Sequence, residues 1–192
     1  MKKWLVGRTL QISIAFGLFS IGCTMPSEEV DQISQPLIGG TLYRATFWGG
    51  AGDNLLTVNG NEYNNLPSGW TKFGAQGSIW SERTTDSNRR PLYRMWSSQG
   101  TDHLFTWDAA EYDNDLNLGW IGEGDILDDG RRGIGYVYPE YANPGGPCAR
   151  RVYRMWSQPK HLYTIDFNEM NTLDTQALYD REAFGEFFIY GC

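Results

Sequence analysis

The stretch LYRMWSSQGTDHLFTWDAAE at residues 92–111 decides the fold of this chain, because it returns in altered form as VYRMWSQPKHLYTIDFNE at residues 152–169. A third version begins at Leu42-Tyr43-Arg44, where fewer aromatic residues follow. Repetition at such spacings predicts units that are too small to bury their own apolar faces and therefore pack against one another. The sequence thus predicts three related units that share one core.

We refer to residues 42–91, 92–151 and 152–192 as the first, second and third segments. Runs such as LYRMW and HLFTW combine aromatic and β-prone residues between Ser, Gly and Asp. This composition is typical of short strands, so each segment is expected to open with a pair of strands. The same strand order then recurs in every segment.

A short helix is predicted after each pair of strands. Asp108 and Asp166 stand three residues before a Glu, and Asn59 stands in the same relation to Glu62. At a helix start, such a side-chain acceptor and the following Glu both satisfy backbone donors. Each helix is expected to end soon at a glycine, because glycine adopts the left-handed conformation that closes helices: Gly69, Gly119 and, in the third segment, Gly185.

The predicted fold class is therefore mainly β with one short helix per repeat. Three pseudo-symmetric repeats are expected to form a closed, β-trefoil-like architecture, with a small open solenoid or a propeller-like ring as alternatives. The third segment begins 60 residues after the second, which itself begins 50 residues after the first. We interpret residues 125–151, rich in Gly, Pro and Tyr, as an insertion that accounts for the difference.

The N-terminal residues are typical of an export signal. Residues 1–22 combine a basic start with an apolar stretch and small residues, which predicts a signal peptide. Cys23 ends a sequence that resembles a bacterial lipoprotein cleavage box, so Cys23 is expected to carry the lipid and residues 23–41 to form anchor and tether. An ordinary signal peptide with a chance cysteine, and hence a secreted protein, is the alternative.

The remaining cysteines, Cys148 and Cys192, form an even pair in a chain expected to reach an oxidising compartment. Such a pair indicates a disulfide, although two unpaired thiols are the alternative. Removing the basic residues of the signal (Lys2, Lys3 and Arg8) takes the net charge from −7 to −10. Nucleic acid is therefore an unfavourable partner, and membrane contact is expected through the N-terminal lipid alone. We expect a monomer.

The repeated elements resemble a family of secreted tandem repeats, domain of unknown function 5648. They are YRMW, HLFT, DAAE and GW in the second segment and YRMW, HLYT and DFNE in the third. The first segment is degenerate, with YRAT and NLLT. The resemblance covers Leu42 to Cys192 and implies an accessory binding or adhesion role in a bacterial envelope lipoprotein at the outer membrane.

No residue set predicts catalysis, a cofactor or a metal. His103 and His161 occupy equivalent positions but lack the close ligand spacing of a structural metal site. The run from Asp113 to Gly124 resembles a calcium loop, yet Leu118 stands at its turn position and Gly124 at its bidentate-Glu position. Because the acidic residues recur with the repeat, whereas catalytic pairs are normally unique, they favour structural ion pairs with the recurring arginines.

Binding through aromatic and polar surface groups remains as the predicted function. Exposed indole and phenol faces stack on sugar rings while polar groups supply directional hydrogen bonds. Alternation along the strand places Trp96 on the same face as Arg94. The predicted ligand-binding residues are Trp96, Trp156, Arg94, Arg154, His103, His161, Asp102, Tyr136, Tyr138 and Tyr141. A glycan is the expected ligand. The alternative is a protein-interaction or hydrolase-inhibitor module that contacts an envelope or secreted protein through residues 125–151.

Overall fold

The computed structural model describes residues 38–192, except 50–51 and 84–85. The predicted signal peptide, Cys23 and most of the predicted tether lie outside the described residues. Within the described part of the chain, no helix is long and apolar enough to cross a membrane. The fold is mainly β, with three short α-helices, as the sequence predicted.

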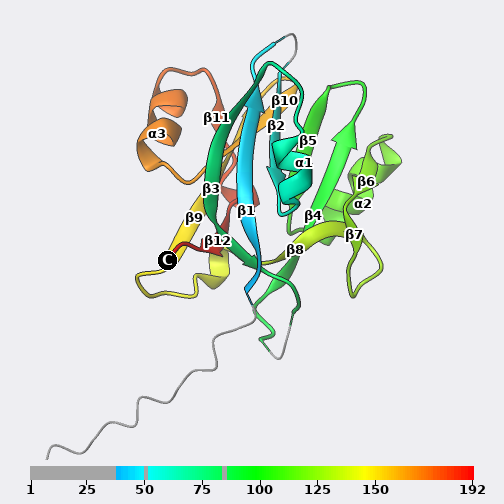
Figure 1. The fold of residues 1–192 in the computed structure, drawn as a ribbon, viewed down its shortest axis with the longest axis vertical. Coiled ribbons are helices and arrows are strands. Elements are labelled where there is room, and N and C mark those ends of the chain that lie inside the picture. Colours follow the sequence, from blue (N-terminus) through cyan, green and yellow to red (C-terminus); the bar gives the residue numbers. More distant parts are fainter. Residues whose placement is uncertain (1–37, 50–51, 84–85) are drawn as a thin grey trace, which may run out of the picture. The chain divides into compact units, whose positions relative to one another are not determined.

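Each segment opens with a long strand, a shorter antiparallel strand and a helix (Figure 1). In the first segment these are β1 (Ile38–Phe47), β2 (Asp53–Thr57) and α1 (Gly60–Asn64), followed by β3 (Trp70–Trp80). The second segment has β4 (Arg90–Ser97), β5 (Asp102–Thr106) and α2 (Ala109–Asn117), and the third has β9 (Ala149–Ser157), β10 (Lys160–Thr164) and α3 (Phe167–Thr175).

The return strands differ between segments. In the second segment, the return comprises β6 (Ile121–Glu123), β7 (Asp125–Ile126) and β8 (Arg132–Pro139), followed by the 3-10 helix η1 (Glu140–Ala142). In the third, it comprises β11 (Asp180–Arg181), the 3-10 helix η2 (Ala183–Gly185) and β12 (Phe187–Tyr190). In the first segment, the single long strand β3 forms the whole return.

The interpretation of residues 125–151 as an insertion is wrong for its middle part. Strand β8 lies between β3 and β4 in the sheet, and Tyr136, Val137 and Tyr138 are buried. The Gly and Pro residues around these tyrosines predict a surface segment. In the structure, the tyrosines alternate with valine and glycine along a core strand. The extra residues are therefore confined to the turn around β7 and to the connection between η1 and β9.

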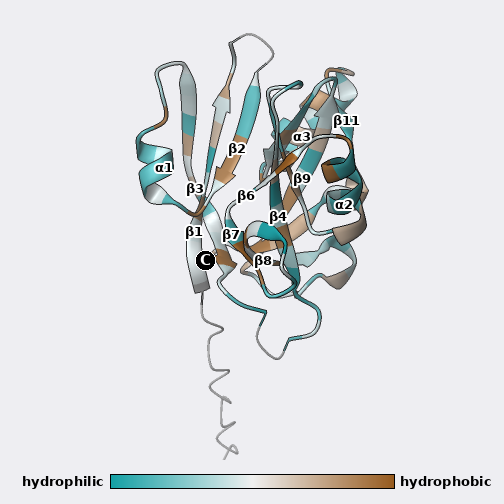
Figure 2. Ribbon diagram, turned by 90° about the vertical axis from the view of Figure 1, so that its right-hand side faces the viewer, coloured by the Kyte–Doolittle hydropathy of each residue, from teal (hydrophilic) through white to brown (hydrophobic). Residues whose placement is uncertain are grey.

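The strands form one antiparallel sheet of twelve strands, and seven of them follow one path in the order β10-β9-β12-β3-β8-β4-β5. The other five pair beside this path: β1 with β3, β2 with β1, β6 with β4, β7 with β8 and β11 with β9. Its hydrogen-bonded order ends at β10 and β5, so the sheet is not closed and the β-trefoil-like closure is not confirmed. Nevertheless β2, β5 and β10, the second strands of the three segments, contact one another in every pairing. The helices lie on the outside of the strands, and Figure 2 shows α1 and α2 mainly in hydrophilic colours.

The main hydrophobic core takes equivalent residues from all three segments. Leu42, Leu92 and Val152, each next to the Tyr-Arg pair, are at most 2% exposed. Leu56, Phe105 and Tyr163 from the second strands belong to the same cluster. Phe105 and Tyr163 meet edge to face, with ring centroids 5.3 Å apart. Burial of such side chains contributes about 2 kcal/mol each, so the segments stabilise one another through this cluster.

The helix starts confirm the predicted caps but not the predicted role of the Glu. Asn59, Asp108 and Asp166 each accept hydrogen bonds from backbone N–H groups of the first turn. A preceding Thr hydroxyl in turn accepts from the backbone N–H of each cap residue, at 3.0 Å in all three segments. The Glu side chains do not fold back onto their own caps, as a capping box requires. They point to arginines of neighbouring segments.

The predicted role of Gly185 at a helix end is wrong. Helix α3 ends at Thr175 with Gln176 as its C-cap, and the next residue, Ala177, has a φ of 51°. The corresponding residue after α2 is Gly119, with a φ of 93°. Gly185 instead lies against the Arg154 guanidinium, where an added Cβ would stand 2.0 Å from Nε. The glycine is therefore required by close approach rather than by a turn.

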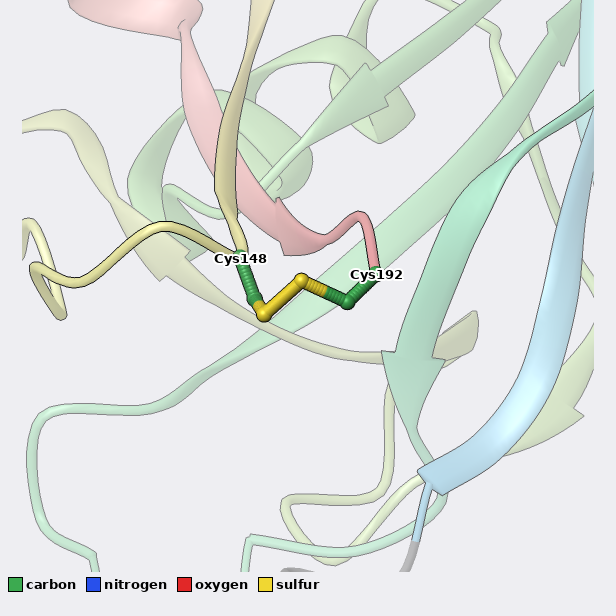
Figure 3. Close-up of a disulfide and its surroundings, with 2 residues drawn as sticks. All are labelled: Cys148 and Cys192. Atoms are coloured by element: carbon green, nitrogen blue, oxygen red, sulfur yellow. A yellow bond between two sulfur atoms is a disulfide. The ribbon is translucent and has the colours of Figure 1, made fainter.

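The Cys148–Cys192 disulfide is confirmed (Figure 3). It joins the residue before β9 to the residue that ends the chain after β12, with Cα atoms 5.0 Å apart. Because β9 and β12 are hydrogen-bonded neighbours, the bond links the residue before β9 to the end of β12 across this strand pair.

Candidate functional site

Each Tyr-Arg arginine is buried and binds a glutamate at the start of a helix in another segment. Arg94 donates to Glu62 at 2.9 and 2.7 Å, and Arg154 donates to Glu111 at 2.8 Å through both Nη atoms. Arg44 completes the cycle by donating to Glu169 at 2.7 Å through both. Two parallel bonds between a guanidinium and a carboxylate fix both groups in orientation. We call the three contact regions the first (Arg94), second (Arg154) and third (Arg44) junctions.

The junction glutamates are held in the ionised form. Burial would raise the pKa of Glu62, Glu111 and Glu169, but hydrogen bonds from the arginine and from a threonine, together with the arginine charge, outweigh it and lower each pKa below its ordinary value. Hydrogen bonds to the charged form stabilise that form. The prediction that the recurring arginines pair with recurring acids is therefore confirmed.

A second carboxylate completes two of the junctions. Glu123 accepts from Arg94 Nε at 2.9 Å, and Glu182 accepts from Arg154 Nε at the same distance. Phe73 occupies the equivalent position at the third junction, where the Arg44 guanidinium lies 4.2 Å from the ring centroid. Within the described part of the chain, Arg44 Nε has no hydrogen-bond partner.

The two histidines also hold junctions together. His103 Nδ1 lies 2.8 Å from Asp53, and His161 Nδ1 lies 2.7 Å from Asp102. The same aspartates accept from the histidine backbone N–H groups at 3.0 Å. Burial lowers the pKa of His103, but the hydrogen bonds to Asp53 and Glu123 outweigh it and raise this pKa. At the third junction, the equivalent position to the histidines holds Asn54, which donates to the His161 carbonyl at 2.6 Å.

The structure therefore assigns most of the predicted ligand-binding residues to internal contacts. Arg94, Arg154, His103, His161 and Asp102 are buried in the junctions. Trp96 and Trp156 are half-buried and pack on His103 and His161, with ring centroids 4.6 and 4.7 Å apart. Binding through the remaining exposed faces of these two indoles stays a prediction.

The predicted surface tyrosines divide in the same way. Tyr136 and Tyr138 are buried beside Trp80, so the expectation that they reach solvent is wrong. Tyr141 is 62% exposed and lies edge-on to Trp107, with ring centroids 5.4 Å apart. One of the three tyrosines thus remains accessible to a ligand.

A cavity of about 320 Å³ lies at the first junction. Its polar wall consists of Glu62, Arg94, Glu123 and Asp125, and Val58 and Ile134 form the apolar wall. Gly124 and Gly133 also line it, and their backbones meet so closely that a Cβ on Gly124 would lie 2.2 Å from the Gly133 carbonyl oxygen. The cavity is bounded by both the first and the second segment.

A second cavity of about 270 Å³ adjoins the first, since the two share Val58, Asp125 and Ile134. Gly39, Gly40, Trp80 and Tyr136 lie along its wall, together with Asp128. We call the two cavities together the junction groove. Concave sites of several hundred Å³ with a few polar groups in an apolar lining are typical of small-molecule binding.

The second junction is filled where the first is open. Trp107, which follows Thr106 as Val58 follows Thr57, is 9% exposed and donates to the Glu186 carbonyl at 3.0 Å. Phe184 covers it from the third segment, with ring centroids 5.7 Å apart. The same arginine clamp is therefore present without the hollow.

The third junction is filled as well. Ile165 takes the position of Val58, and Phe73 lies over Arg44. The space between Arg44, Gln76 and Ile165 is too small for a water molecule. Among the described residues, the first junction is thus the open one of three built on one pattern.

The chemistry of the junction groove is that of hydrogen bonding and charge. Within the described residues, no group of three or more His, Cys, Asp or Glu side chains could hold a metal ion. Hydrogen bonds from His103 and Arg94 lower the pKa of Glu123, although burial opposes them. Glu62 and Glu123 therefore act as acceptors near neutral pH rather than as proton donors.

Residues 41–188 match the family described as a domain of unknown function, DUF5648. The chain belongs to this family. No curated protein and no solved structure matches the chain. The DUF5648 match includes the three arginine clamps and all residues that line the first cavity, whereas Gly39 and Gly40 of the second cavity lie just outside it.

Sequence reasoning missed the residues that open the groove. Val58, Asp125 and Gly133 do not recur between the segments, so a comparison of the shared residues does not detect them. A usable signal was present, because Val58 stands where Trp107 and Ile165 stand in the other DUF5648 segments. Residues that differ between the segments line the cavity, whereas residues that recur in the segments form the clamps of the scaffold.

Proposed function

We propose that the protein is a non-catalytic module of the bacterial cell envelope that binds a glycan in the junction groove. The observation that carries the proposal is the hollow first junction, whose equivalents are filled by Trp107 and Phe184 or by Ile165 and Phe73. A scaffold that needed only stability would fill all three, because a cavity in a packed interior lowers stability.

The lining of the groove suits a saccharide. Glu62, Glu123 and Asp125 supply acceptors for hydroxyl groups, and Val58 and Ile134 offer an apolar wall to the C–H face of a sugar ring. Gly124 and Gly133 carry no side chains, so a ring can approach the backbone. The cavities of about 320 and 270 Å³ together have the size of a site for a small oligomer.

The same carboxylates argue against glycoside hydrolysis. Such hydrolysis uses one carboxyl group with a raised pKa as general acid. Arg94 lies between Glu62 and Glu123 and binds both, and the pKa of each is lowered. Binding without turnover is therefore the better account of this pair.

We extend the proposal to the architecture and the location. Three pseudo-symmetric repeats arranged about a common axis would explain why Arg94 binds Glu62, Arg154 binds Glu111 and Arg44 closes the cycle with Glu169. The export signal and Cys23 support an outer-membrane lipoprotein that works as a monomer, with secretion as the alternative.

A protein-interaction or hydrolase-inhibitor role for residues 125–151 has less support. Strand β8 belongs to the sheet, which leaves Ile126 and Tyr141, 69% and 62% exposed, as the large apolar side chains available to a partner. Deletion of the whole stretch would remove a core strand. Because Ile126 also lines the second cavity, Tyr141→Ser alone would instead probe the surface outside the junction groove.

Filling the groove tests the glycan proposal. Val58→Trp introduces the residue that the second junction has at this position, and Ile165→Val is the matched control at a closed junction. The purified full chain and both variants would be tested on a glycan array and by calorimetry with the glycans that bind. We expect Val58→Trp to lose binding by at least about tenfold and Ile165→Val to retain it.

Further variants and an unfolding measurement distinguish a filled groove from a misfolded chain and from binding at the repeated indoles. Thermal unfolding of Val58→Trp shows whether the indole is accommodated, and Asp125→Arg, at an exposed position, blocks the groove without entering the core. Trp96→Ala and Trp156→Ala report on the repeated indoles. Binding that survives both groove variants but is lost in the indole variants would move the site to the repeats, and absence of binding to every glycan would refute the function.

A further inference from the structure

We infer that the glycan bound in the junction groove is an amino-sugar oligomer with free, protonated amino groups. The inference rests on the proposed function and adds the chemical class of the ligand. It follows from three observations: the groove has a net negative charge, two of its carboxylates have acceptors open to a ligand, and its single lining guanidinium already binds protein carboxylates.

The groove has more negative than positive charge. Glu62, Glu123 and Asp125 line the first cavity and Asp128 lines the second, whereas Arg94 is the single cation among the described lining residues. Arg132 lies near the rim and donates to the Gly124 carbonyl at 2.8 Å. Four carboxylates therefore face two guanidinium groups, and an anionic ligand would be repelled.

Arg94 already binds protein groups through all three of its side-chain nitrogen atoms. Its Nε donates to Glu123, its two Nη atoms donate to Glu62, and one Nη also lies 3.3 Å from His103 Nε2. The Arg94 side chain is 9% exposed, so it cannot turn toward an acidic ligand without breaking the junction. The carboxylates, not the guanidinium, are thus what the cavity offers to a ligand.

Two acceptors near the mouth of the first cavity remain open. The exposed Asp125 carboxylate takes part in no hydrogen bond or ion pair among the described residues, and Glu123 uses Oε2 for Arg94 and His103. Glu123 and Asp125 line the same cavity. An ammonium group has three donors and no acceptor, so it can bridge two such carboxylates.

The rest of the lining distinguishes a sugar amine from a bare ammonium. Val58 and Ile134 face the same cavity and provide contact for a ring, while Gly133 leaves room beside them. The adjoining cavity continues past Asp128 to Gly39 and Gly40. A linear oligomer with an amine on each ring would place successive positive charges near Asp125 and near Asp128.

The test compares two ligands that differ only in acetylation. Calorimetry with the full chain at about pH 6, where amines are protonated, would measure binding of a glucosamine oligomer and of its N-acetylated form of equal length. We expect the free amine to bind at least about tenfold more tightly and its binding to weaken with added salt, since ionic contacts at the surface are screened. Asp125→Asn should weaken binding of the amine about fivefold and weaken binding of the acetylated form much less, since the Asn amide oxygen still accepts from hydroxyl groups.

The outcomes separate this inference from the function beneath it. Equal or tighter binding of the acetylated oligomer, or no effect of Asp125→Asn, would overturn the amino-sugar assignment while the glycan-binding function stands. Tight binding of the amine that Val58→Trp does not weaken would also overturn it, because the charges involved would then lie outside the groove. Absence of binding to both oligomers and to all other glycans would refute the inference and the function together.

Discussion

The first and second junctions share one clamp and differ in what surrounds it. Both have a buried arginine held by two glutamates, and a histidine bound to an aspartate of the preceding segment. At the first junction Val58 leaves a cavity of about 320 Å³, and at the second Trp107 and Phe184 pack together. The comparison shows that the clamp is common to both junctions, while the neighbouring side chains determine whether a junction is open or filled.

Opening the second junction should have the largest effect. Trp107→Val removes a buried indole and its hydrogen bond to Glu186 and leaves a cavity, so we expect a loss of roughly 3 kcal/mol in the free energy of unfolding. Denaturant unfolding measures this. Trp48→Val, at a position 58% exposed, is the matched control and should change stability by less than about 0.5 kcal/mol.

A similar cost for the two tryptophan variants would contradict the view that Trp107 fills the second junction. A gain of glycan binding by Trp107→Val would support that view, because the opened second junction would then bind a ligand as the first is proposed to do.

Breaking the clamps should come next in size. Arg154→Met leaves Glu111 and Glu182 without their guanidinium, and we expect a loss of about 2 kcal/mol, below the full penalty of a buried pair since both carboxylates are about 30% exposed. Arg44→Met removes the partner of one carboxylate and should cost about half as much. Arg131→Met, in an exposed pair, is the control, with an expected loss under about 0.5 kcal/mol.

Denaturant midpoints of the three arginine variants would rank them. If Arg44→Met proved as destabilising as Arg154→Met, the second glutamate at the complete junctions would contribute nothing, and the comparison between complete and incomplete clamps would fail.

The smallest expected effect concerns pH at the first junction. Because the pKa of His103 is raised in the folded chain, its contribution is fully present below about pH 6.5 and is lost as the pH rises through the folded value. Measured between about pH 5.5 and 8.5, the free energy of unfolding should fall as the pH rises, with a slope from this one group of at most about 1.4 kcal/mol per pH unit. The lowered pKa values of Glu62 and Glu111 keep these groups ionised throughout that range.

His103→Asn places at the first junction the residue that the third junction has, Asn54. Unfolding curves of this variant should show a flatter dependence on pH than those of the wild-type chain. Parallel curves would assign the titration to another group.

Local structure was largely predictable from the sequence. The paired strands and the caps at Asn59, Asp108 and Asp166 follow from patterns that short-range chemistry controls, and the Cys148–Cys192 bond follows from the even number of remaining cysteines. The pairing of arginines with recurring acids was also predictable, because buried charges need partners.

Long-range structure was not predictable in the same way. Glu62, Glu111 and Glu169 match the capping signature, and only the packing of segments reveals that each reaches another segment's arginine. The burial of Tyr136 and Tyr138 depends on β3 and β12 lying beside β8. The groove escaped prediction because its signal is a small residue, Val58, at a position where the other segments have Trp107 and Ile165, and a search for residues that the segments share does not detect such a difference.

The position of Gly39 and Gly40 has a consequence for how a ligand is presented. Both residues line the second cavity, and β1 begins at Ile38, so the chain enters the domain at one end of the groove. If the chain is fixed to a surface through its N-terminal side, a long polymer in the groove would run past the point where the anchoring segment joins the domain.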